Sequence, residues 1–111
     1  MITPPLLQDR FQQLDWPHQL GNLASTMAHI ASNANSPEYD SLTADLLREA
    51  ALLIEWSAPH VPAPFQLELA NMQRELLAWH RLWPLDAARP LLAMQSRGHA
   101  DRLLQIAGFI G

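Results

Sequence analysis

Apolar residues recur at helical spacing along the chain, in segments that prolines separate from one another. β-branched residues are few, and apolar and polar residues do not alternate over any length. The pattern therefore predicts helices and no strands. The segment after Pro17 shows it well, because its apolar residues fall on a single helical face. These residues are Leu20, Leu23, Ala24, Met27, Ile30, Ala31 and Ala34.

Five helices are expected from the proline positions and the apolar stripes. Thr3 before Pro4 and Pro5 is a cap signal for a short first helix of roughly ten residues, with Leu7, Phe11 and Leu14 on one face. The second helix starts near Pro17, and Ser36-Pro37 caps a third. The core stripe of the third helix is Tyr39, Leu42, Leu46, Ala50 and Leu53.

The last two helices alternate spacings of four and three residues between apolar positions, which is the pattern of helices that pack along their length. The fourth carries Phe65, Leu69, Met72, Leu76, Trp79 and Trp83, and the fifth carries Leu92, Ser96, His99, Leu103, Ile106 and Ile110. These two helices should pack antiparallel. We therefore predict an all-α fold, an up-down four-helix bundle with a short additional N-terminal helix lying across it. A length of 111 residues is typical of one domain, so residues 1–111 are expected to form a single one.

Composition removes several classes of function. The seven basic residues are all arginine and are scattered, while Asp and Glu number 11, giving a formal charge of -4. No basic cluster favours nucleic acid or an anionic membrane surface as partner. Without lysine and cysteine there is no Schiff-base, thiolate or disulfide chemistry. The longest apolar run, at 50–54, is too short to cross a membrane, and the N-terminus does not resemble a signal peptide, so we expect a cytoplasmic protein.

Two histidines lie on the second helix, His18 and His29, on the polar face that also carries Asn22 and Ser25. Eleven residues of helix separate them by roughly 16 Å, so they cannot share a metal ion. The segment after His29, "IASNAN", offers neither a carboxylate to orient the ring nor a cation to hold a phosphoryl group. His29 is therefore expected to be an ordinary solvated side chain.

His99 is different, because it falls within the apolar stripe of the fifth helix, one turn after Ser96. We expect a buried or nearly buried imidazole that is bonded to a hydroxyl, a carbonyl or water, with ligand binding as the alternative. His80 sits at the margin of the stripe of the fourth helix, where a ring can bury one edge.

A pocket is expected at one end of the bundle. In an up-down arrangement, the start of the second helix, the end of the third and the C-terminus meet there. The residues brought together would be Asp15, Trp16, His18, Trp56, His60 and Phe109. A small-ligand or metal site built around His18 and His60, or around His99, is thus one candidate function. No E-x-x-H pair occurs, so the di-iron pattern of helical bundles is missing and no cofactor is expected.

Leu52 and Trp56 fall outside the core stripe of the third helix, on the side that carries Asp45 and Glu49. A large aromatic residue beside a leucine is typical of a surface that binds another protein, which makes a homodimer plausible. Alternatively, the N-terminal helix or the loop at 57–64 covers both residues.

The segment "RELLAWH", Arg74 to His80, resembles the signature of HEPN-type ribonucleases, small helical bundles that dimerise to form their site. The resemblance implies Arg74 and His80 as the matched residues and RNA as the substrate. On a straight helix, however, these two side chains point about 120° apart.

An enzymatic function is disfavoured, because no glycine-rich loop and no serine with a suitable base and acid can be identified. The sequence favours a non-enzymatic interaction or adaptor module that binds a protein partner or itself through Leu52 and Trp56.

Overall fold

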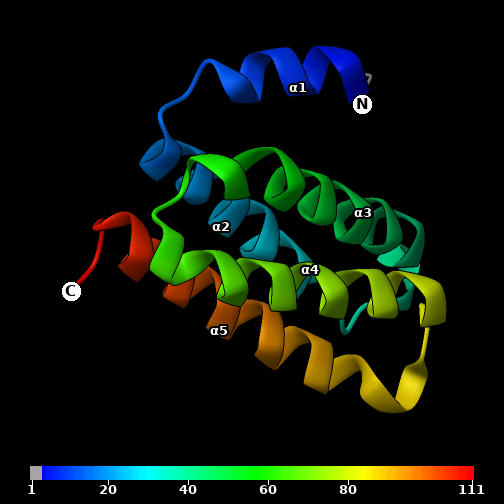
Figure 1. Cartoon of the computed structure of the whole chain (residues 1–111). Coiled ribbons are helices and arrows are strands. Elements are labelled where there is room, and N and C mark those ends of the chain that lie inside the picture. Colours follow the sequence, from blue (N-terminus) through cyan, green and yellow to red (C-terminus); the bar gives the residue numbers. More distant parts are fainter. Residues whose placement is uncertain (1–3) are drawn as a thin grey trace.

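The computed structural model describes residues 4–111, and most of them lie in helices (Figure 1). Within these residues there are five α-helices and no strand: α1 Pro4–Gln12, α2 Trp16–Asn33, α3 Asp40–Ser57, α4 Ala63–Leu82 and α5 Arg89–Ala107. Three short 3₁₀ helices stand in the connections: η1 Pro37–Tyr39, η2 Ala58–His60 and η3 Asp86–Ala88. The expected cap residue Thr3 lies outside the described residues.

Local chemistry sets where the helices begin and end. Asp15 caps α2, because its carboxylate accepts a hydrogen bond from the backbone N–H of His18, and Pro17 occupies the first turn. At the other end of the chain, α5 stops at Gly108, whose φ of 83° is the left-handed conformation that glycine adopts without strain.

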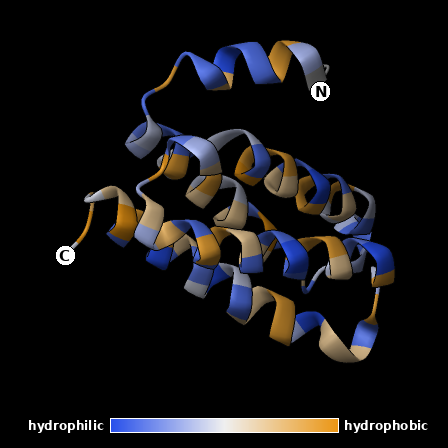
Figure 2. Cartoon of the chain, viewed as in Figure 1, coloured by the Kyte–Doolittle hydropathy of each residue, from blue (hydrophilic) through white to orange (hydrophobic). Residues whose placement is uncertain are grey.

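The predicted all-α fold is confirmed: α2 to α5 form an up-down four-helix bundle, and α1 packs on the outer side of α3 (Figure 1). Around the bundle, α2 lies between α3 and α5, and α4 lies next to α3. Each helix carries apolar and polar residues on different faces (Figure 2). The apolar faces meet in one core, which includes Leu69, Met72 and Leu76 of the α4 stripe.

Two helix pairs differ in how closely they approach. The backbones of α2 and α5 lie nearest to each other, because small residues face one another there, including Gly21 and Ala24 of α2 and Ala100 of α5. The chain runs in opposite directions along α4 and α5, as expected, but their backbones stay further apart.

The core stripes deviate from the prediction at two helix ends. Tyr39 is exposed, because it is the last residue of η1 and α3 starts only at Asp40. Leu47, Ala51 and Ile54 of α3 are buried in the core in addition to the predicted stripe. Ile110 is also exposed, since α5 has already ended at Ala107.

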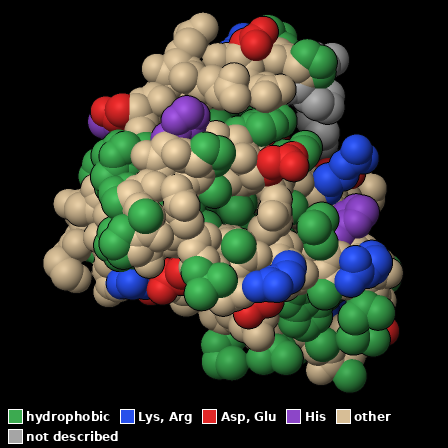
Figure 3. All heavy atoms as spheres, in the orientation of Figure 1, with side chains coloured by type: hydrophobic (Ala, Val, Ile, Leu, Met, Phe, Trp, Pro, Cys, Tyr) green, Lys and Arg blue, Asp and Glu red, His purple; other side chains and the backbone are tan. Residues whose placement is uncertain are grey.

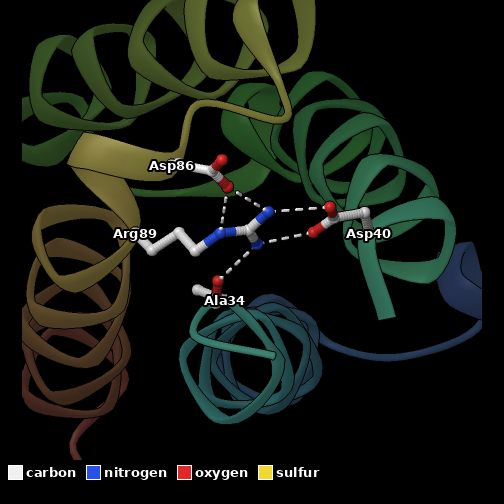
Figure 4. Close-up of polar contacts among 4 residues, drawn as sticks. All are labelled: Ala34, Asp40, Asp86 and Arg89. Atoms are coloured by element: carbon white, nitrogen blue, oxygen red, sulfur yellow. Dashed lines mark hydrogen bonds and ion pairs between the residues drawn. The ribbon is translucent and has the colours of Figure 1, made fainter. Parts of the chain in front are cut away.

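Arg89, the first residue of α5, is a buried arginine that joins three segments (Figure 4). Its guanidinium donates to both carboxylate oxygens of Asp40 (2.6 and 2.8 Å), to Asp86 (2.9 Å) and to the carbonyl of Ala34, the C-cap of α2 (3.1 Å). These hydrogen bonds hold the pKa of Asp40 below its ordinary value and raise the pKa of Arg89. Arg89 thereby fixes the start of α5 to the end of α2 and the start of α3.

Candidate functional site

A groove of about 330 Å³ lies between α4 and α5, close to the connection that joins them. Leucine, alanine and tryptophan side chains form most of its wall. The lining residues are Glu75, Ala78, Trp79, Leu82, Leu85, Ala88, Leu91 and Gln95. We call this the α4–α5 groove.

Several leucines of the groove are unusually exposed for their type. Leu82 is 61% exposed, and Leu85 and Leu91 are also open to solvent. Met94, one turn beyond Leu91 on α5, is exposed as well. Figure 3 shows hydrophobic side chains gathered over the end of the molecule where the α4–α5 connection lies. A contiguous apolar surface of this kind is a usual mark of a binding site.

Long polar side chains explain why the two helices stand apart. Arg102 of α5 donates to Glu68 of α4 (2.9 Å), and further along the seam the Nε2 of His99 donates to the carboxylate of Glu75 (2.8 Å). Such pairs span more space than interlocking leucines and alanines. Nearer the connection between α4 and α5, leucines take the place of these polar pairs. The space between the two helices stays open there and forms the groove.

The wall of the groove is held in place by its neighbours. The indole Nε1 of Trp79 donates to Oε1 of Gln95 (3.0 Å), which links α4 to α5. The Trp79 ring packs edge-on against Trp83 (6.3 Å between ring centres), and the guanidinium of Arg89 lies 5.1 Å from the Trp83 ring. Trp79, the aromatic residue of the groove, is therefore held in place by Gln95 and by Trp83, which Arg89 contacts in turn.

Leu52 and Trp56, the surface predicted from the sequence, are both half-buried. Trp56 packs against Phe11 of α1, with 6.1 Å between the ring centres, and Phe11 is only 2% exposed. The N-terminal helix thus covers Trp56, which is the alternative that the sequence left open.

The pocket predicted at the end of the bundle is present in part. Asp15, Trp16 and His60 line one pocket of about 390 Å³, together with Gln12, Leu14 and Gln19. His18 is not among the lining residues. Its Nδ1 donates to Asp15 Oδ1 (2.5 Å), and its ring packs edge-on against Phe109 (5.5 Å between ring centres). The start of α2 therefore meets η2 at this pocket, and Phe109 near the C-terminus reaches the start of α2 through His18. Trp56 and Phe109 do not line the pocket, and the two imidazoles do not line it together.

His99 lies on the α4–α5 seam, where its side chain is 24% exposed. It is thus half-buried rather than buried, and its partner is a carboxylate instead of the expected hydroxyl, carbonyl or water. The sequence pattern placed it in the apolar stripe, but the wide spacing of α4 and α5 leaves that position open to solvent.

The remaining singled-out residues lie on helix surfaces. His29 is exposed, as expected. Burial raises the pKa of the Glu49 carboxyl, and the coulombic interaction with His29 offsets this only in part. His80 is half-buried and Arg74 is exposed, where it donates to the side chain of Asn71. Because α4 runs unbroken through Arg74 and His80, these two side chains leave the helix about 120° apart.

The described residues form neither a metal-ligating cluster nor a membrane-spanning helix. Among residues 4–111, no three His, Asp or Glu side chains gather closely enough to hold a metal ion. None of the helices in this part of the chain is long and apolar enough to cross a membrane. No family model matches the sequence, and no curated protein or solved structure matches the chain.

The apolar stripes of the sequence do not predict the α4–α5 groove. A signal was nonetheless present, since Leu82, Leu85 and Leu91 lie outside the two core stripes. Leu82 and Leu91 flank the connection bounded by Pro84 and Pro90, and Leu85 lies within it. Leucines that no stripe accounts for are candidates for a surface that another molecule covers.

Proposed function

We propose that this chain is a non-enzymatic interaction module that binds an amphipathic helix of a partner protein in the α4–α5 groove. The observation that carries the proposal is the row of exposed leucines around an apolar hollow, Leu82, Leu85 and Leu91. Leaving these side chains in water is unfavourable, and a partner that buries them gains about 25 cal/mol for each Å² of apolar surface removed from water.

The shape of the groove favours a helix as the occupant. Its walls are two antiparallel helices, and a third helix can lay one ridge of side chains into the hollow between them. The occupant would present apolar anchors at spacings of three and four residues. Trp79, fixed by Gln95 and Trp83, supplies a rigid aromatic contact for such an anchor.

A second copy of this chain fits the groove less well than a different protein does. A two-fold contact sets the same surface of both copies against each other, so a hollow would face a hollow. A projecting ridge on a different protein fills the hollow and buries the leucines more completely.

Charge indicates the composition of the partner helix. Carboxylates stand beside the groove at Glu75, which lines it and accepts from His99, and at Asp86, which accepts from Arg89 while its side chain stays 88% exposed. The chain as a whole carries a formal charge of -4. A helix whose apolar face is flanked by arginine or lysine would therefore be attracted to this surface, and an acidic one would be repelled.

The proposal is tested with a synthetic amphipathic peptide that has leucines at helical spacing and basic flanks. Binding is measured by calorimetry to the parent protein, to Leu82→Ser and to Leu67→Ser. Leu67 is the matched control, because it lies on the same helix and is 69% exposed but does not line the groove. We expect Leu82→Ser to weaken binding by about tenfold, as for an anchoring side chain, and Leu67→Ser to leave it unchanged.

Two results would overturn the proposal. The first is equal binding of the peptide to all three proteins. The second is a stable dimer in light scattering that Leu82→Ser abolishes and Leu67→Ser retains, since this would assign the groove to a second copy of the chain.

A further inference from the structure

The pocket at the start of α2, the α1–α2 pocket, contains an unused hydrogen-bond acceptor. Gln19 lines this pocket and is only 2% exposed. Its Nε2 donates to the backbone carbonyl of Phe11 (3.2 Å), which fixes the orientation of the amide, while its Oε1 has no partner among the described residues. Burying a hydrogen-bond acceptor without a donor costs free energy. The described residues supply no donor to this oxygen, so a donor from a bound molecule would remove that cost.

A second acceptor, the carboxylate of Asp15, lines the same pocket. Its Oδ1 accepts from the backbone N–H and the ring Nδ1 of His18, and no hydrogen bond to its Oδ2 is present within residues 4–111. The backbone hydrogen bond from His18, and then the ring hydrogen bond, lower the pKa of Asp15, so the carboxylate is ionised at neutral pH. The pocket thus offers a carboxylate that His18 pairs through one oxygen only, next to the Gln19 side chain, whose buried oxygen lacks a donor.

The rest of the lining suits a flat cation. Trp16 is half-buried and forms an aromatic wall, and aromatic rings attract guanidinium and ammonium groups. No arginine lines the pocket, and the chain has no lysine, so no permanent positive charge of the protein neutralises Asp15 there. His60 on η2 is the remaining ionisable residue of the lining.

We propose that the α1–α2 pocket binds a guanidinium group, whose planar array of N–H donors matches the Asp15 carboxylate and the Gln19 oxygen beside the Trp16 ring. Its volume of about 390 Å³ is at the lower end of the range for small-ligand sites, which is enough for a guanidinium with a short aliphatic stem. The same chemistry is presented by a free alkylguanidine and by an arginine side chain of another protein. This site is separate from the α4–α5 groove and does not depend on it.

The proposal is tested by an NMR titration of the ¹⁵N-labelled protein with n-butylguanidinium, and in parallel with n-butylurea, which has nearly the same shape without the charge. We expect n-butylguanidinium to shift the indole N–H of Trp16 and the side-chain amide of Gln19 in a saturable manner, and n-butylurea to bind at least about tenfold more weakly. A blocked arginine tripeptide distinguishes the sources: tighter binding than n-butylguanidinium assigns the site to a protein, and weaker binding assigns it to a small molecule.

Three variants make the test specific. Asp15→Asn removes the charge but keeps a good helix cap, so α2 should still form, and we expect about tenfold weaker binding. Gln19→Met removes the unpartnered oxygen and should also weaken binding. Asp9→Asn is the control, because Asp9 is an exposed carboxylate of α1 that does not line the pocket. Equal binding of the urea, undiminished binding to Asp15→Asn, or shifts confined to the α4–α5 seam would each overturn the proposal.

Discussion

Replacing Phe11 by alanine tests how α1 is held on the bundle. Phe11 is 2% exposed and packs against Trp56, and it is the only buried residue of α1 for which burial is described. A buried phenylalanine replaced by alanine typically costs about 3–5 kcal/mol when the surroundings keep their positions. Here α1 can detach instead, since nine residues do not form a stable helix alone. We therefore expect a smaller loss of unfolding free energy, about 2–3 kcal/mol, the transfer free energy of the side chain.

The assay combines urea denaturation with hydrogen exchange. Phe11→Ala should lower the unfolding free energy by this amount and remove the protection of the α1 amides, while α2 to α5 remain protected. Leu6→Ala is the control on the same helix, because Leu6 is exposed and its loss should change stability by less than about 0.5 kcal/mol. An unchanged unfolding free energy in Phe11→Ala, or α1 amides that stay protected, would show that Phe11 does not anchor the helix.

Other predictions concern stability and its dependence on pH. Gly98→Ala should raise the unfolding free energy by up to about 1 kcal/mol in urea denaturation, because Gly98 lies within α5 and an added Cβ meets no atom within 4 Å. Asp40→Asn should lower stability at pH 7, and the difference from the parent should shrink below pH 3.8, because protonation of Asp40 through its lowered pKa costs the parent its contact with Arg89. Glu49→Gln should gain stability relative to the parent as the pH rises above 4.5, since burial raises the pKa of Glu49 and its ionisation destabilises the fold. Thermal melts of parent and variants across pH measure both differences.

Much of the fold follows from the sequence, because strong helical periodicity leaves few alternatives. The α4 stripe is an example: Leu69, Met72 and Leu76 are buried as their spacing predicts. The failures lie at helix ends, where single residues decide. The spacing of Ile110 continues the apolar stripe of α5, but Gly108 ends the helix before this residue is reached.

The candidate sites were harder to predict, because they depend on distances between helices. The meeting of Asp15 and His60 at one pocket follows from up-down topology alone. The α4–α5 groove does not, since it depends on the distance between α4 and α5, which side-chain pairs such as Glu75 with His99 bridge. The burial of Arg89 likewise could not be predicted, because its hydrogen-bond partners Asp40 and Ala34 lie 49 and 55 residues away in the sequence. A local sequence pattern does not connect residues so far apart.

The central claim, that the α4–α5 groove binds a partner helix, is tested most directly by locating a bound helix. A basic amphipathic peptide with a nitroxide label is added to protein that carries ¹³C-labelled leucine methyl groups. The account predicts that the label broadens the signals of Leu82, Leu85 and Leu91 and leaves those of Leu67 and Leu52 sharp. Broadening centred on Leu52, or spread evenly over the exposed leucines, would contradict it.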